Sequence, residues 1–161
     1  MAIYLDFAGK KTGSVTTQGY EGTSECNSFQ WGVSRSIGTA ASGSAARESS
    51  NPSISEISIT KLADGASADL ATYALAGKLD QTFTIHFTTT TEGQVTEFLT
   101  HTLENVGMSH FSVSSGGDLP MESMSLNYTK ITTSFIPTNP SVGGDTKRVG
   151  FDLTTMTSSS G

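Results

Sequence analysis

Residues 28–33, SFQWGV, decide the fold, because large apolar residues alternate there with small or polar ones. Successive side chains along a strand point to opposite faces, so this spacing predicts a strand with one face in a core. The core face is expected to carry Phe29, Trp31 and Val33. The opposite face, toward water or a partner, is then expected to carry Ser28, Gln30 and Gly32.

The same alternation recurs along the chain, so we predict an all-β protein. It is found in residues 3–7, 57–59, 83–87 and 149–153. Two longer segments, 95–115 and 122–136, change midway which positions are apolar. Such a switch is typical of a bulge or bend that lets one strand serve two sheets. The residues therefore predict an all-β domain whose two long strands either serve two sheets or turn the corner of a barrel.

One short helix is predicted in residues 67–78, SADLATYALAGK, where apolar residues recur at helical spacing. Ser67 is the expected N-cap and Gly77 the expected stop. We take residues 1–161 as a single domain.

A long polar loop and a polar tail complete the chain. Residues 38–52 hold almost no bulky apolar side chain, so we expect an extended, structureless arm there. The tail, residues 157–161, is expected to fray.

The composition excludes several classes of protein. Of 161 residues, 24 are Ser and 24 are Thr, whereas only 15% are charged. A net charge of −6 argues against nucleic-acid binding, which needs a basic surface. No apolar run is long enough to insert in a membrane, and the N-terminal residues are typical of a strand rather than a signal peptide. Cys26 is the only cysteine, which excludes an intramolecular disulfide.

The chain offers no recognisable catalytic pattern. Ser109 and His110 are adjacent in an expected strand, so their side chains should point to opposite faces. The three histidines, which include His86 and His101, lack metal-binding spacing and are expected on exposed polar faces. Trp31 is expected to anchor the core. We therefore predict no enzyme activity, no catalytic residue, no metal site and no cofactor.

Residues 25–36, ECNSFQWGVSRS, resemble the SFSWG strand of the haemolysin-coregulated protein (Hcp) family, the tube protein of bacterial type VI secretion. The resemblance continues in order through most of the chain. The similar segments are ISITKLADGASADLATYALAGK (57–78), FLTHTLENVGMSHFSVSSGG (98–117), PMESMSLNYTKI (120–131) and VGFDLTTM (149–156).

The resemblance implies two packed antiparallel β-sheets forming a barrel-like core, with one short helix outside, and it implies an assembly. Six subunits would form a ring, and rings would stack into a tube. The implied partners are further copies, the contractile sheath and spike proteins, and small effector proteins in the lumen, with no nucleic acid and no membrane insertion. The protein would be made in the bacterial cytoplasm and secreted without a signal peptide.

Three groups of residues are assigned to this assembly. The lumen-facing group is Ser28, Gln30 and Gly32. The ring-stacking group in the arm is Thr39, Ser42, Ser44, Arg47 and Glu48. The subunit seam is the small-residue helix face at Ala68, Ala71 and Ala76.

Two alternatives remain open. The first is the tail-tube protein of a phage, which is the same kind of object in another particle. The second is a small-ligand carrier built as a β-barrel, which would be a monomer with a large apolar cavity. A hydrolase is a distant third.

Overall fold

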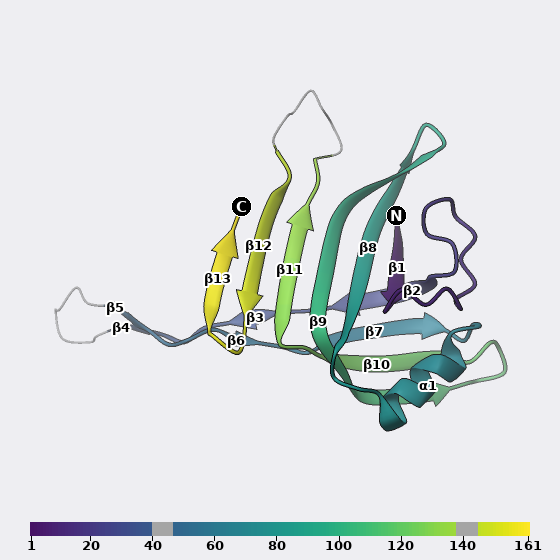
Figure 1. Cartoon of the computed structure of the whole chain (residues 1–161), viewed down its shortest axis with the longest axis horizontal. Helices are drawn as coiled ribbons and strands as arrows, with labels where there is room; N and C mark the ends of the chain where they lie inside the picture. The colour runs from purple at the N-terminus through teal and green to yellow at the C-terminus, as the bar shows by residue number, and fades with distance from the viewer. Residues whose placement is uncertain (40–46, 138–144) are drawn as a thin grey trace.

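The computed structural model describes residues 1–39, 47–137 and 145–161 of the chain (Figure 1). The described elements are β1 (Ala2–Phe7), β2 (Ser24–Gln30), β3 (Val33–Ser34), β4 (Ile37–Thr39), β5 (Arg47–Ser49), β6 (Ser53–Ile54), β7 (Ile57–Leu62), α1 (Ser67–Ala76), β8 (Gln81–Thr91), β9 (Gln94–Ser114), β10 (Met121–Asn127), β11 (Lys130–Phe135), β12 (Lys147–Asp152) and β13 (Thr157–Ser160).

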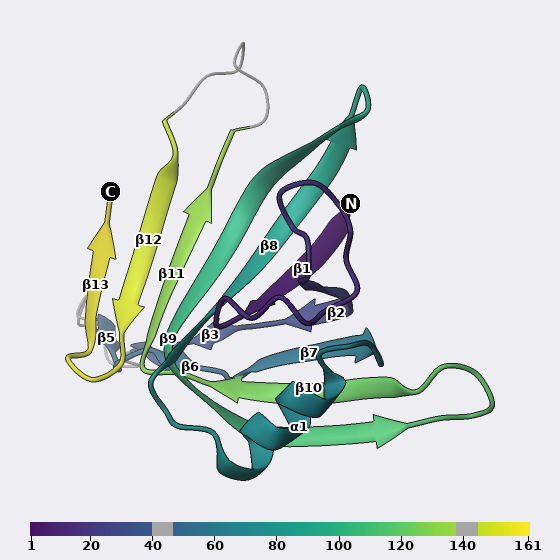
Figure 2. The same cartoon turned by 45° about the vertical axis from the view of Figure 1, so that its right-hand side comes forward.

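Six strands close into an antiparallel barrel. The sheet runs β10-β7-β2-β1-β8-β9, and β10 also pairs with β9, which joins the two ends. Strands β11, β12 and β13 continue the sheet from β9 outside the barrel, side by side in Figure 2. The predicted all-β, barrel-like architecture with one short helix is confirmed.

The 21-residue strand β9 bends between two parts of the nine-stranded sheet, and the change in its apolar pattern predicted such a bend. Its first half pairs with β8 and β11, and its second half pairs with β10. The pairing of β9 with β8 shifts register between Gln81 and Phe83 and again between Phe87 and Thr88. Its pairing with β10 shifts register once, between Ser125 and Leu126. At the central shift Asn105 adopts a left-handed φ of 53°. Its side-chain amide donates a hydrogen bond to Thr129 Oγ1 at 2.8 Å, which fixes the corner.

Segment 122–136 forms two strands rather than the one expected. Strand β10 ends at Asn127 and β11 begins at Lys130, because the chain leaves the closed barrel between them and enters the extension of the same sheet. The apolar parity changes at this crossing.

The barrel interior is filled by side chains from alternate strand positions. Burial of this apolar surface is the main stabilising term of the fold. The fully buried apolar residues are Ile57, Ile59, Leu70, Phe83, Ile85, Leu103, Val106, Met124 and Leu126.

The strand predicted at residues 28–33 is shorter than expected. Strand β2 ends at Gln30, and the chain bends before the two-residue strand β3. Phe29 and Trp31 pack against the core, but Val33 lies beyond the bend and is 53% exposed.

Ser67 and Gly77 flank the helix as predicted, but neither forms the cap that was expected of it. Ser67 is the first helical residue, not the N-cap, and its Oγ accepts a hydrogen bond from the Asp64 amide at 2.9 Å. Gly77 ends the helix in an extended conformation, so no left-handed turn requires glycine there. A Cβ at Gly77 would instead lie 2.4 Å from the Tyr73 ring, so close packing requires it.

The arm and the tail are more ordered than predicted. Strands β4 and β5 form a two-stranded ribbon that projects from the body on the left of Figure 1. Residues 157–160, expected to fray, form the edge strand β13 on β12.

A buried ion cluster lies between β7 and β10. Lys61, which is fully buried, pairs with Asp64 Oδ1 and Glu122 Oε2, each at 2.8 Å. Glu122 Oε2 has no hydrogen-bond partner among the described residues, so only the charge of Lys61 compensates it. Burial opposes ionisation of Asp64, but hydrogen bonds from Lys61 and Ser24 outweigh it and lower the pKa of the carboxyl.

Replacing Lys61 with Met should destabilise the protein by about 3–5 kcal/mol, because two buried carboxylates lose their cation. The control is Lys130→Met, which removes an exposed pair with Glu104 at 3.7 Å and should cost at most about 0.5 kcal/mol. Urea unfolding measures both. Equal losses would contradict the buried cluster.

Candidate functional site

A hydroxyl-rich wall covers the outer face of β2, β7, β10 and the end of β9. Two rows of side chains cross these strands in register. The rows are Gln30–Ser58–Ser125–His110 and Ser28–Thr60–Ser123–Ser112. Hydroxyl groups both donate and accept hydrogen bonds without carrying charge. The wall therefore offers many weak polar contacts, and His110 is the one titratable side chain in its two rows.

The sequence-predicted Ser28 and Gln30 head these two rows, and both are exposed. Ser28 Oγ and Thr60 Oγ1 are 2.6 Å apart across the strands. Gly32, predicted on the same strand face, lies outside β2, and its amide donates to Ser55 Oγ at 2.9 Å. The other members of the rows could have been found from the alternation in β7 and β10.

The outer face of α1 is apolar rather than merely small. Ala68 and Ala76 are exposed and Ala71 is half-buried. Sequence reasoning missed their neighbours Leu75 and Leu79, which are 88% and 71% exposed. The signal was available, because both leucines lie off the buried stripe that begins at Leu70.

The predicted arm residues divide between two parts of the chain. Thr39 and Arg47 are paired in the β4–β5 ribbon, and Glu48 pairs with Gly38. Ser42 and Ser44 lie outside the described residues.

An apolar groove of about 190 Å³ opens at the base of the arm, and sequence reasoning missed it. Its lining includes Trp31, Ile54, Val149 and Phe151. The Trp31 indole donates to Tyr128 Oη at 2.7 Å, which holds the ring in place.

Ser109, His110 and His86 each form a hydrogen bond with another side chain of the described part of the chain. Ser109 Oγ donates to the Glu56 carboxylate, whereas His110 contacts Ser112 at 3.1 Å, so Ser109 and His110 do not interact. His86 lies opposite the core, as predicted, and contacts Glu97 Oε2 at 2.5 Å.

Glu97 also binds the loop between β1 and β2. It accepts a hydrogen bond from Tyr20 Oη at 3.2 Å, and Tyr20 stacks on Tyr4 at 5.0 Å. Burial, helped by the Glu97 carboxylate, raises the pKa of Tyr20 to about 12.

His101 contradicts the expectation that all three histidines are exposed. It is 4% exposed and stacks on Phe29 with ring centroids 5.0 Å apart. Its Nδ1 lies 2.8 Å from Thr133 Oγ1. Burial lowers the pKa of His101 to about 4. Its parity, shared with Leu99 and Leu103, was the signal that sequence reasoning missed.

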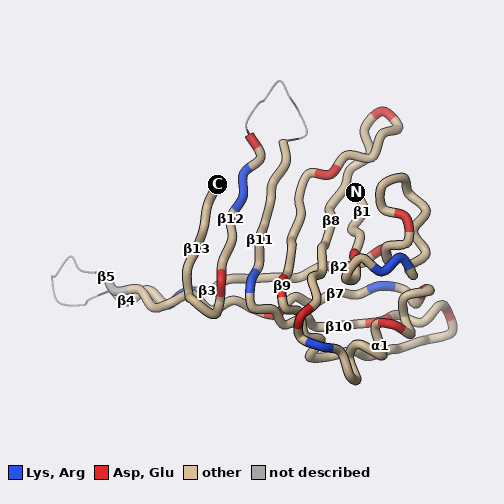
Figure 3. Tube along the Cα trace, viewed as in Figure 1, with Lys and Arg blue, Asp and Glu red and all other residues tan. Residues whose placement is uncertain are grey.

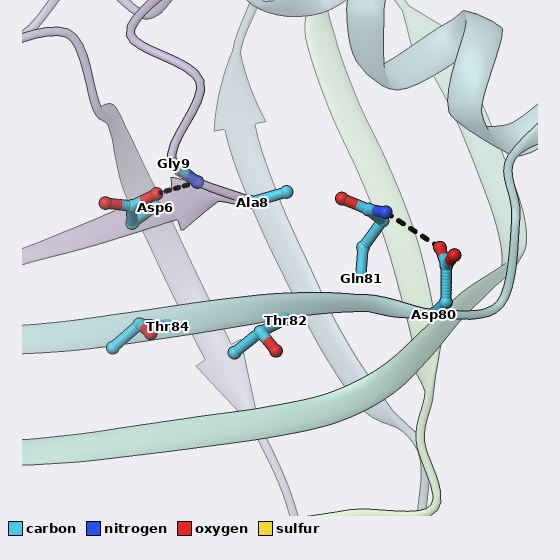
Figure 4. A pocket seen from close by; sticks show the side chains of 7 residues that line it. All are labelled: Asp6, Ala8, Gly9, Asp80, Gln81, Thr82 and Thr84. Carbon is cyan, nitrogen blue, oxygen red and sulfur yellow. Dashed lines mark hydrogen bonds between the residues drawn. The ribbon is translucent and has the colours of Figure 1, made fainter.

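A shallow polar pocket of about 400 Å³ lies between the end of β1 and the start of β8 (Figure 4). Both of its carboxylates are engaged: Asp6 accepts from the Gly9 amide at 2.8 Å, and Asp80 from Gln81 at 2.7 Å. Within residues 1–39, 47–137 and 145–161, no group of three His, Cys, Asp or Glu could hold a metal ion. The part of the chain that the structure describes contains no membrane-spanning helix.

A family model described as "Type VI secretion system effector, Hcp" matches residues 4–135. The chain belongs to the Hcp family. The resemblance carried by its strand and helix segments is thus confirmed. No curated protein sequence matches the chain.

Solved Hcp structures share the fold over nearly the whole chain. Hcp1 from Salmonella typhimurium is 18% identical with a TM-score of 0.75, covering 98% of both chains. Hcp3 from Pseudomonas aeruginosa, described as a secreted protein, is 17% identical with a TM-score of 0.58, covering 99% of this chain and 96% of its own. A structure described as a type six secretion system protein is 24% identical with a TM-score of 0.85, covering 98% and 99%.

His101 should make this Hcp-family chain less stable in acid. Above pH 6.5, the ordinary pKa, the imidazole is neutral in both folded and unfolded states. As the pH falls toward about 4, the folded-state pKa, only the unfolded state takes up the proton, so stability is lost. The loss should be on the order of 3 kcal/mol.

Urea unfolding between pH 7.5 and 4.5 measures this loss. His101→Phe should flatten the curve over this range, whereas the exposed control His110→Phe should leave it unchanged. Parallel curves for wild type and His101→Phe would show that the buried imidazole is not responsible.

Proposed function

We propose that this chain is a structural subunit of the type VI secretion tube. It forms hexameric rings that stack into a tube, is secreted with the tube, and carries small effectors in the lumen. The observation that carries this proposal is the Hcp family match over residues 4–135, on a closed barrel that β11–β13 extend on one side.

The hydroxyl-rich wall supports a lumen role for Ser28, Gln30 and Gly32. A surface of serine and threonine hydroxyls stays hydrated and makes exchangeable hydrogen bonds. Cargo against such a wall is not held by charge, so it can be released when the tube comes apart.

The subunit seam is proposed at the outer face of α1, at Ala68, Ala71 and Ala76. Small side chains let another backbone approach closely, and an apolar helix face is costly to leave in water. A ring needs a heterologous contact, in which each copy presents one surface to a different surface of its neighbour.

The arm is proposed to join one ring to the next, through Thr39, Ser42, Ser44, Arg47 and Glu48. The β4–β5 ribbon projects beyond the body of the subunit in Figure 1. Because residues 38–52 are mainly polar, the stacking contact should be weaker than the ring contact.

The proposed role is non-catalytic and takes no cofactor. Ser109 and His110 support this, because each is hydrogen-bonded to a different neighbour. The proposed route is synthesis in the bacterial cytoplasm, then release through the secretion apparatus together with its sheath and spike proteins, without a signal peptide.

Shortening the arm should separate ring formation from stacking. Replacing residues 39–47 with Asn-Gly keeps the Ile37–Ser49 and Gly38–Glu48 pairs and closes the ribbon with a two-residue turn. Native mass spectrometry should show rings of six subunits for wild type and variant alike. Negative-stain images at high concentration should show stacked rings only for the wild type.

A variant that is monomeric would mean that the arm holds the ring itself. A wild-type protein that is monomeric at every concentration would refute the tube proposal.

A further inference from the structure

Helix α1 is apolar on the face that it turns outward. Its inner stripe buries Leu70, while Leu75 is 88% exposed and Leu79, just after the helix, is 71% exposed. Leu79 packs closely on Gly107 of β9: a Cβ at Gly107 would lie 2.7 Å from Leu79 Cδ2. The same face carries the exposed Ala68, Thr72 and Ala76, and large apolar side chains grouped on a surface typically mark a contact with a partner.

The groove at the base of the arm has the matching chemistry. It is lined almost entirely by apolar side chains, and its walls include Val33 and Val149, which are 53% and 51% exposed. Charged residues of both signs lie near the lining along the chain: Arg35 and Lys147 are two residues from Val33 and Val149, whereas Glu56 is two residues from Ile54. The groove can therefore receive an apolar helix face.

Charge is distributed unequally between these two parts of the chain. Residues 31–56 and 129–161, which form the groove and the sheet extension, carry five basic and four acidic residues. Residues 1–30 and 57–128, which form the barrel and α1, carry four basic and eleven acidic residues. Figure 3 shows Lys and Arg on β12 and most Asp and Glu on the barrel side. Leu79 itself lies between Lys78 and Asp80, so the difference in charge belongs to the two parts of the chain as a whole.

We propose that the apolar groove of one copy receives the Leu75–Leu79 face of α1 from the next copy in the ring. This inference rests on the proposed ring and names the surface that faces α1 across its seam. In Figure 1 helix α1 lies at the lower right, whereas β12 and β13, which carry part of the groove lining, lie to the left, so one subunit can use both surfaces at once when contacts repeat.

A second copy fits better than a different protein because one chain carries both halves of the contact. The two surfaces match in apolar character. The groove belongs to a part of the chain with a net charge of +1, whereas α1 belongs to a part with a net charge of −7, which favours the approach of one part to the other. When the contact repeats and the ring closes, every groove is occupied by a helix face and every helix face lies in a groove.

Two substitutions test the contact from its two sides. Leu75→Glu disables the helix face and leaves the groove intact, whereas Val149→Glu disables the groove and leaves the helix face intact. The control Val95→Glu charges a third exposed apolar residue, at the distant β8–β9 turn. Circular dichroism and thermal melting confirm folding, and Val33→Glu replaces Val149→Glu if the latter does not fold.

We expect wild type and Val95→Glu to form rings, and each of the other two variants to be monomeric by native mass spectrometry and sedimentation. The loss of a central apolar contact should weaken association at least about thirtyfold. Mixing the two variants should give one-to-one dimers and no rings, because only one intact groove and one intact helix face can meet.

Rings formed by Leu75→Glu and Val149→Glu at wild-type affinity would overturn this seam and leave the proposed tube standing. A mixture that stays monomeric would also overturn it, because the intact groove would not have accepted the intact helix. If the wild type forms no ring, the seam and the proposed tube fail together.

Discussion

The architecture depends on one corner, where Asn105 on β9 donates a hydrogen bond to Thr129 between β10 and β11. Both long segments bend here between the part of the sheet that contains β10 and the part that contains β11, and both change at this point which parity faces the core. A left-handed φ at Asn105 makes the turn possible, since asparagine tolerates that conformation better than most residues. If either segment ran straight on, one half of its apolar side chains would face water. The corner therefore closes the barrel and sends β11–β13 outward.

Closure leaves the molecule with few open edges. Within the barrel each strand has neighbours on both sides, because β10 returns to β9. The sheet extension ends at β13, which is four residues long and carries hydroxyl side chains instead of apolar ones. A short polar edge is a poor template for uncontrolled strand pairing. Association is thus directed away from the backbone edge, toward side-chain surfaces such as the outer face of α1.

The sequence predicted what depends on local alternation. The parity switches in 95–115 were readable because burial alternates along a strand whatever lies across from it. The end of β2 at Gln30 was not, because the bend that exposes Val33 depends on the pairing of β3 with β6. The Lys61–Glu122 pair occupies core parity on β7 and β10, but only the register shows that these residues lie opposite each other. The hydroxyl rows likewise needed the register of four strands before Ser28 and Gln30 could be given neighbours.

Some polar side chains lie in the core and some large apolar side chains lie on the surface, and the two groups have opposite consequences. Inside, Lys61 and His101 occupy core positions, and each has its partner in the same chain: Asp64 and Glu122 for the cation, Thr133 for the imidazole. These intrachain partners offset the cost of removing the two polar side chains from water, so no second subunit is required to pair them. Outside, Leu75 and Val149 are half or more exposed and have no comparable cover in the single chain. An apolar surface of that kind gains free energy only when a second surface removes it from water. The buried charges thus belong to the folding of one subunit, and the exposed leucines and valines to its association.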